Sequence, residues 1–333
     1  MALLLQYTLI YASVLLLVAL GGCFSERSGI INLGLEGIMV AGALGGALVM
    51  KYMPNLSPAA MVIGVVIGSV VFGMVFSLLL AVAAINFNAD QTLVGTAMNM
   101  LATAAATVFV KAINMAENPN NVASTIQYIN QKKAFSIVKI AGFEINWFMI
   151  ITIVLLIAAN VVLYHTRLGL RLMACGEHPQ AADSVGINVY KMRYIGVLIS
   201  GFLGGLGGIV YITAGVSEWK FENGVAGFGF LALAVMIFGQ WKPNLIALAA
   251  LLFGLFRALS NVYSGFDFLV ALNIPGTFYK MLPYIISLLV LAVSSGKSRA
   301  PKAEGIPYDK GQDRKSTRLN SSHSDRSRMP SSA

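Results

Sequence analysis

Long apolar segments alternate with short polar segments along nearly the whole chain. Each apolar segment is close to the roughly 20 residues that an α-helix needs to cross a membrane, and is longer than the alternating strands of an outer-membrane barrel. The pattern predicts about nine membrane-spanning helices, within a range of eight to ten. The expected spans are 2–23, 29–50, 58–85, 91–112, 147–164, 193–214, 226–240, 244–263 and 279–296.

Two of these spans differ from the others. The span 226–240 is short for a hydrocarbon core of about 30 Å, and the span 29–50 is rich in glycine and carries a charged residue. Irregular backbone at membrane depth is tolerated where protein or a water-filled cavity covers it. Both spans are therefore candidates for broken or re-entrant helices.

A polar, basic insert, 165–193, interrupts the apolar pattern. Pro179 suits the first turn of a helix and Gly186 suits the left-handed position that ends one, which predicts a helix of about two turns between them. Arg167 and Arg171 lie at helical spacing just before it, so the insert resembles a helix–turn–helix along the membrane surface. We interpret it as docking on a protein or a lipid headgroup. The alternative, a loop whose positive charge only sets topology, explains the cations but not the helix caps.

Composition places the chain in the membrane class. Apolar residues make up 57% of the chain and charged residues 11%, whereas charged residues alone are about a quarter of a soluble domain. The predicted fold is therefore an all-α, polytopic membrane helix bundle. The first span lacks a basic leader and a cleavage site, and we expect it to be a retained helix.

Lysine and arginine predict the orientation. The insert holds four of them and the segment after Gly296 holds nine, so both belong on the cytoplasmic side. An odd number of spans then places the N terminus outside, although the lysine-containing segment 113–146 becomes external. We expect a transmembrane domain at 1–296 and a basic, disordered cytoplasmic tail at 297–333. Within that tail, 311–333 has the composition of vector-derived, non-native sequence. The net charge of +9 reflects tail and topology, so no nucleic-acid partner is expected.

Two spans carry polar residues at helical spacing. Asn32 and Glu36 are four residues apart, and so are Asn99 and Thr103. A carboxylate at the bilayer centre costs about 3 kcal/mol, so Glu36 should face the bundle interior or a wet cavity. One interpretation is that these four residues line a path for a neutral, hydroxylated solute. The alternative is structural hydrogen bonding between helices, or an ion pair of Glu36 with Arg27.

The sequence contains no recognisable catalytic or metal-binding set. Cys175 and His178 have a metal-like spacing but lack a second ligand pair, and no catalytic triad can be assembled. Cys23 and Cys175 should lie near the cytoplasmic side and stay reduced. We expect no cofactor, no metal and no catalytic residue.

Several motifs resemble the permease subunits of ATP-binding-cassette importers, in the superfamily for branched-chain amino acids, ribose and nucleosides. The resemblance covers most of 20–296. The first motif is most similar to that of nucleoside-type permeases. The motifs are Phe24-Ser25-Glu26-Arg27-Ser28-Gly29-Ile30-Ile31-Asn32-Leu33-Gly34-Leu35-Glu36-Gly37, Thr166-Arg167-Leu168-Gly169-Leu170-Arg171, Gly186-Ile187-Asn188 and Gly227-Phe228-Gly229-Phe230. The turn after Gly239 departs from the usual family pattern, which leaves its role open.

The resemblance implies a nucleoside importer of the bacterial cytoplasmic membrane that works by alternating access. Its implied partners are a cytoplasmic ATP-binding subunit, a second permease subunit, an extracytoplasmic substrate-binding protein or lipoprotein, and membrane lipid. The insert would be the region that couples to the ATPase, through Arg167, Arg171, Ala174, Gly176, Glu177, Ala181, Ala182 and Gly186.

Three alternatives remain at this stage. Within the same class, the solute would be a ribose-like sugar or a branched-chain amino acid. A secondary transporter or channel would need coupling carboxylates in the spans, and beyond Glu36, Asp90 and Asp267 there are few. A membrane-embedded enzyme would need an acid, base or metal cluster.

Overall fold

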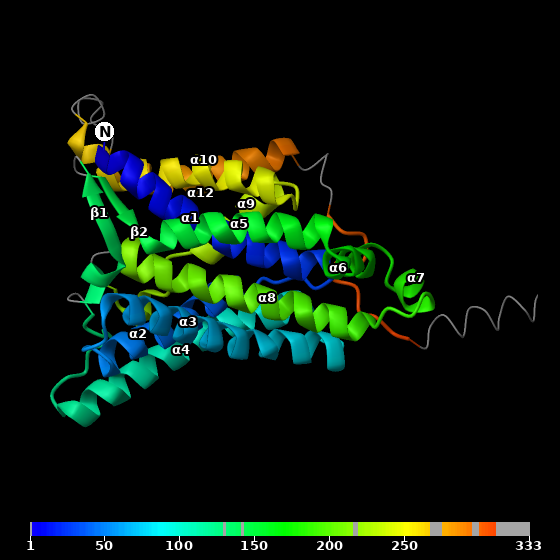
Figure 1. Cartoon of the computed structure of the whole chain (residues 1–333), viewed down its shortest axis with the longest axis horizontal. Coiled ribbons are helices and arrows are strands. Elements are labelled where there is room, and N and C mark those ends of the chain that lie inside the picture. The colour runs from blue at the N-terminus through cyan, green and yellow to red at the C-terminus, as the bar shows by residue number, and fades with distance from the viewer. Residues whose placement is uncertain are drawn as a thin grey trace, which may run out of the picture.

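The chain forms a bundle of helices that lie side by side, seen in Figure 1 with their axes roughly horizontal. The structure, a computed structural model, describes residues 2–128, 131–140, 143–215, 219–266, 275–294 and 300–310. The long helices are α1 (Ala2–Arg27), α2 (Leu35–Tyr52), α3 (Pro58–Ala81), α4 (Gln91–Glu117), α5 (Trp147–His165), α8 (Val189–Val210), α9 (Phe228–Phe238), α10 (Pro243–Val262) and α12 (Gly276–Ser294).

Shorter elements connect these helices. Single π-helical turns extend α3 and α8, and a two-stranded antiparallel hairpin precedes α5. The short elements are η1 (Val82–Asn86), η2 (Gln131–Phe135), β1 (Ser136–Ile140), β2 (Phe143–Asn146), α6 (Arg167–Glu177), α7 (Pro179–Ser184), η3 (Tyr211–Gly215), η4 (Phe221–Asn223) and η5 (Tyr263–Gly265).

The predicted fold class is confirmed. Among the described residues, eight helical segments are long and apolar enough to cross a membrane, and α12 is a further 19-residue helix. Both unusual spans are broken. The helix α2 begins only at Leu35, after a non-helical segment 28–34, and α9 has 11 residues, which is too short to cross a membrane alone.

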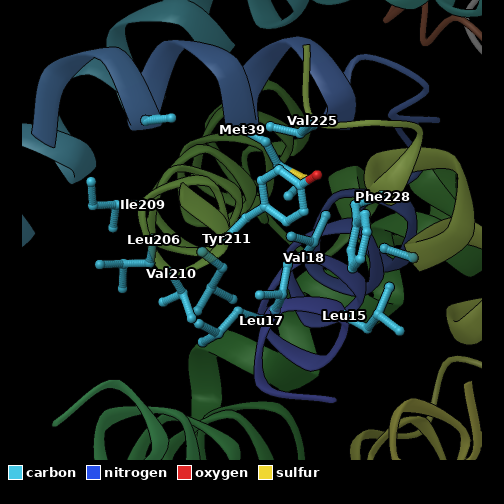
Figure 2. Close-up of a cluster of buried hydrophobic side chains, with 14 of the residues drawn as sticks. Leu15, Leu17, Val18, Met39, Leu206, Ile209, Val210, Tyr211, Val225 and Phe228 are labelled. Atoms are coloured by element: carbon cyan, nitrogen blue, oxygen red, sulfur yellow. The ribbon is translucent and has the colours of Figure 1, made fainter. Parts of the chain in front are cut away.

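The helix α1 forms the centre of the bundle, where it packs along α8 and α10. Most of its side chains after Thr8 are buried, so a helix that is apolar all round is enclosed by protein. Figure 2 shows Leu15, Leu17 and Val18 of this helix beside side chains of α8 and the rings of Tyr211 and Phe228. This cluster joins α1, α2, α8 and α9 into one core.

Glycines let three helices approach one another closely. A side chain at Gly42 of α2 would collide with the backbone of Gly205 in α8, and one at Gly73 of α3 would collide with Gly201. The hydroxyl of Ser69 donates to the carbonyl of Gly205 at 2.6 Å. Packing through small residues explains the recurring glycine pairs of the sequence.

The insert forms the expected pair of helices, α6 and α7. Thr166 caps α6 by accepting from Gly169 N at 3.2 Å, and Pro179 occupies the first turn of α7. Gly186 has a φ of 84°, and Ile187 N donates to Ala182 O at 3.0 Å, so the helix ends in the left-handed conformation that the sequence predicts.

The two ends of the bundle differ. The N terminus and the β1–β2 hairpin lie at one end, while α6, α7 and residues 300–310 lie at the other (Figure 1). The tail that we expected to be disordered from 297 has defined contacts at 300–310, because Pro301, Ala303 and Tyr308 are buried. Residues 297–299 and 311–333 lie outside the described residues, so the rest of that expectation stays a prediction.

We predict that Gly208→Val destabilises the bundle. A side chain at Gly208 would collide with the carbonyl of Met39, which belongs to the backbone of α2 and cannot swing aside. Overpacking of this kind costs about 1–3 kcal/mol, which should lower the melting temperature measured by fluorescence in detergent. Gly64→Ala is the control, since its added methyl meets only the flexible ends of Val49 and Leu56. Equal melting temperatures for the two variants would contradict this packing.

Candidate functional site

Two broken helices meet at the carboxylate of Glu36. Gly227 N donates to Glu36 Oε1 at 2.8 Å, and Gly229 N donates to Glu36 Oε2 at 2.6 Å. Glu36 is 9% exposed and lies in the first turn of α2, while Gly227 and Gly229 begin α9. One side chain therefore joins the starts of two helices that are distant in sequence.

The physical reason is the unsatisfied backbone at a helix start. The first N–H groups of a helix have no partner within it, and lipid offers none. A carboxylate supplies two acceptor oxygens and also interacts favourably with the positive end of each helix dipole. Glycine is needed on the other side, because a side chain at Gly229 would collide with the backbone of Glu36, and Gly227 has a φ of 77°.

Asn99 of α4 satisfies the backbone at the start of α2. Its Oδ1 accepts from Gly37 N at 2.8 Å, and its Nδ2 donates to Leu33 O at 2.8 Å. Gly37 permits this approach, since a side chain there would lie 2.8 Å from the carbonyl oxygen of Met98. The amide of Asn99 thus holds the non-helical segment and α2 against α4.

The expectation that Asn32 and Glu36 share one helix face was wrong. Asn32 belongs to the non-helical segment 28–34 and is fully buried. Its Nδ2 donates to Ser200 Oγ at 2.8 Å, and its Oδ1 accepts from Gly34 N at 3.1 Å. Helical spacing failed as a guide here because the helix begins three residues later than Asn32. Asn32 fastens the segment to α8 and does not line the cavity next to Glu36.

A cavity of about 790 Å³ lies between α4 and the start of α9. It brings together Glu36, Asn99 and Thr103, so three of the four predicted path residues share one cavity. The complete lining is Glu36, Thr96, Asn99, Met100, Thr103, Ala104, Thr107, Val108, Glu222, Asn223, Gly224 and Phe230. The polar stripe of α4 therefore faces a cavity, as its spacing indicated.

The hydroxyls of this stripe differ in their hydrogen bonds. Thr103 donates to Asn99 O at 3.2 Å, and Thr96 donates to carbonyls one turn back. The hydroxyl of Thr107 is buried and has no hydrogen-bond partner within the described ranges. The cavity thus offers neutral hydroxyl groups and two carboxylates. The oxygens of Glu36 already accept from the backbone, and Glu222 is paired with Lys111. Nowhere in the described ranges do three His, Cys, Asp or Glu side chains gather to hold a metal ion.

Residues of the loop 219–227 border the cavity. Glu222 forms an ion pair with Lys111 of α4 at 2.7 Å, which fastens one end of the loop. Glu36 fastens the other end through Gly227 N. Gly224 has a φ of 54°. A Cβ added at this glycine would lie 3.5 Å from the hydroxyl oxygen of Thr103. Sequence reasoning missed this loop, although its closely spaced glycines and acidic residue were a usable signal.

The residues predicted to couple to a partner separate into exposed and buried positions. Arg167, Arg171, Ala181 and Gly186 are exposed, and Ala174 and Glu177 are partly covered. Gly176 and Ala182 are buried. Ala182 packs in a small cluster with Cys175, Val189, Met192 and Tyr308.

Eight segments able to cross a membrane, with a cavity at the junction of two broken helices, identify a multi-pass membrane protein of a kind that occurs among transporters. The family model described as the permease component of branched-chain amino acid transport systems matches residues 4–291. The chain belongs to this family.

Individual relatives are similar over nearly their whole length. The guanosine ABC transporter permease protein NupQ of Bacillus subtilis is 40% identical, over 92% of this chain and 96% of the relative. The nucleoside ABC transporter permease protein NupC of Lactococcus lactis is 39% identical, over 91% and 96%. The putative glucose ABC transporter permease protein TsgC13 of Haloferax volcanii is 31% identical, over 77% and 76%.

We predict that Glu36→Ala is more harmful than Glu36→Gln. Alanine leaves Gly227 N and Gly229 N without acceptors, and each buried, unsatisfied group costs about 1–3 kcal/mol. Glutamine keeps one acceptor oxygen, so it should lose about half as much. Thermal unfolding in detergent measures the difference. Glu117→Gln is the control, because this carboxylate is 57% exposed. Equal stability of the two Glu36 variants would show that the carboxylate does not hold α9.

Proposed function

We propose that this chain is a permease subunit of an ATP-binding-cassette importer that moves nucleosides across the bacterial cytoplasmic membrane. The single observation that carries the proposal is the identity of about 40% over nearly the full length to permeases named for guanosine and nucleosides. The cavity agrees with it. A nucleoside is neutral and carries ribose hydroxyls and base edges, which match hydroxyl and amide groups better than charged ones.

Within this proposal, the cavity is one part of the transport path. Thr103 lines the cavity and is the group with capacity to meet the solute, whereas the hydroxyl of Thr107, which lacks a partner among the described residues, is buried and would have to turn toward the cavity. Glu36 and Asn99 shape the cavity by holding the backbone of α2 and α9. Phe230 is 49% exposed and offers a ring against which a base could stack.

The insert is proposed to dock on a cytoplasmic ATP-binding subunit. Its outer surface carries the cations of Arg167 and Arg171. It also exposes two large apolar side chains, Leu170 at 57% and Val185 at 75%, and exposed apolar groups that lie together are typical of protein interaction sites. Hydrolysis on that separate subunit would then drive the change between inward and outward access. This assignment places α6 and α7 in the cytoplasm and the N terminus outside.

Two further partners complete the proposal. The cavity is open beside α4, whose Met100 and Val108 are 77% and 67% exposed, so a second permease subunit, identical or homologous, would close the path. A substrate-binding protein or lipoprotein would deliver the nucleoside at the end that carries the β1–β2 hairpin. Membrane lipid covers the remaining apolar surface.

A sugar is the second candidate solute. It is favoured by the relative named for glucose, at 31% identity. Both solutes present hydroxyl groups, so the threonine stripe does not separate them, whereas only a nucleoside carries an aromatic base.

Co-purification from membranes tests the function. We expect an ATP-binding subunit and a second permease to accompany the chain, and ATP hydrolysis to rise with nucleoside-loaded binding protein but not with ribose or leucine. A chain that purifies alone and transports in liposomes without ATP would be a secondary carrier, which would overturn the proposal. Stimulation of ATP hydrolysis by ribose alone would show that the solute is a sugar.

We predict that Arg171→Glu abolishes nucleoside uptake while the external binding protein still captures nucleoside. The side chain of Arg171 is exposed on α6, so reversing its charge should disturb docking without disturbing packing. A misplaced like charge at an interface costs several kcal/mol. Arg171→Lys keeps the charge and is the matched control. Uptake in a radiolabelled-nucleoside assay that is equal for Arg171→Glu and Arg171→Lys would exclude this surface as the docking site.

A further inference from the structure

Residues 300–310 return to the end of the bundle that carries the insert, where Figure 1 shows them beside α6 and α7. We name them the C-terminal strap. Ala303 N donates to Gly176 O in α6 at 2.8 Å, and Gly305 N donates to Gly29 O at 3.2 Å. The strap therefore bonds both to the insert and to the non-helical segment that leads to Glu36.

Arg193 at the start of α8 anchors the middle of the strap. Its side chain is 1% exposed, and its Nη2 donates to Ile306 O at 3.0 Å. The guanidinium also lies 6.0 Å from the centre of the Tyr308 ring. A Cβ at Gly29 would lie only 3.0 Å from Nη2, so segment 28–34 passes directly over this cation. A buried cation without a hydrogen-bond acceptor is strongly unfavourable, so Arg193 favours the docked strap.

Tyr308 attaches the strap to the insert. Its side chain is 4% exposed and packs with Cys175 of α6 and Ala182 of α7. Tyr190 packs edge-on against it at 5.4 Å between ring centres and donates its hydroxyl hydrogen to Tyr308 O. Burial beneath this cluster raises the pKa of the Cys175 thiol to about 11. Cys175 should thus be unreactive while the strap is docked.

The strap also touches the turn between α9 and α10. The carboxyl of Glu304 lies beside the carboxyl of Glu26, whose Oε2 accepts from Trp241 Nε1 at 2.6 Å. Burial raises the pKa of Glu304, which favours its neutral, protonated form. Arg27 in turn donates to Trp241 O at 3.1 Å. Through Glu26, the strap is connected to the end of α9 that lies away from Glu36.

We propose that the C-terminal strap transmits movement of the insert to the transport cavity. This proposal rests on the proposed function, since it needs the insert to be moved by an ATPase. The strap is bonded to the insert at Gly176 and to the non-helical segment at Gly29. Asn32 lies in that same segment, and Glu36 lies directly after it in the first turn of α2. A displacement of α6 and α7 is thereby passed to the junction of α2 and α9, and the strap residues are positioning residues that do not touch the solute.

Tyr308→Ala in the full chain, purified with its partner subunits, tests the strap. We expect a thiol-reactive maleimide to modify Cys175 at least about tenfold faster, as mass spectrometry of the separate Cys23 and Cys175 peptides would show. ATP hydrolysis and co-purification should persist. Solute moved per ATP hydrolysed should fall about tenfold, the size of a typical coupling between distant sites. Tyr308→Phe should restore both values, and Lys302→Ala, at an exposed strap position, should match the unmodified chain.

Two results would overturn the strap proposal. The first is faster modification of Cys175 in Tyr308→Ala with an unchanged ratio of transport to hydrolysis, which would make the strap purely structural. The second is unchanged reactivity and unchanged transport, both in this variant and in a chain that ends at 299. Failure of the proposed function looks different, because the unmodified complex would then not transport nucleosides at all. In that case the reactivity of Cys175 would still test the strap, together with the amount of the actual solute moved per ATP hydrolysed.

Discussion

A helix that stops inside a membrane must have its free backbone groups satisfied by protein, and this requirement organises the centre of the molecule. The starts of α2 and α9 both lie within the bundle, and Glu36 serves both of them. Asn99 serves the same purpose for Gly37 and Leu33. The breaks in two helices and the polar residues of the second and fourth spans are therefore two aspects of one constraint.

This constraint also separates the polar residues by role. Asn32 and Asn99 make hydrogen bonds within the protein at both ends of their amides, and each oxygen of Glu36 accepts from the backbone. Thr103 and Thr107 border open space in the cavity. A carboxylate that caps a helix is satisfied by backbone N–H groups, so the presence of Glu36 in the cavity wall does not require a positive partner in a solute. Of the two earlier alternatives, structural hydrogen bonding thus describes Asn32, Asn99 and Glu36, and solute contact stays a prediction.

The sequence predicted the spans well because their length and apolar character follow directly from the thickness of the bilayer. The caps of the insert were also predictable, since Pro179 and Gly186 have local backbone preferences that hold in any context. The segment 28–34 was not, because its departure from the helix is stabilised by Ser200 and Gln91, which lie far away in the sequence. The loop 219–227 was missed for the same reason, because its own glycines and acidic residue do not reveal that its anchors are Lys111 and Glu36.

The end of the bundle that carries the insert shows why residues 300–310 were misjudged. The tail's basic composition suggested disorder, yet a buried guanidinium at Arg193 needs an acceptor, and the strap supplies the carbonyl of Ile306. The same few residues cover Cys175 of the insert and pair with the backbone of Gly29. The insert also meets segment 28–34 directly, because a Cβ at Gly176 would lie 3.3 Å from the backbone nitrogen of Gly29. The insert and the strap therefore both contact a non-helical segment that Asn32 and Gln91 fasten to the bundle. The helix break beside the cavity is thus also the point at which this end of the bundle is joined to the start of α2 and to Glu36.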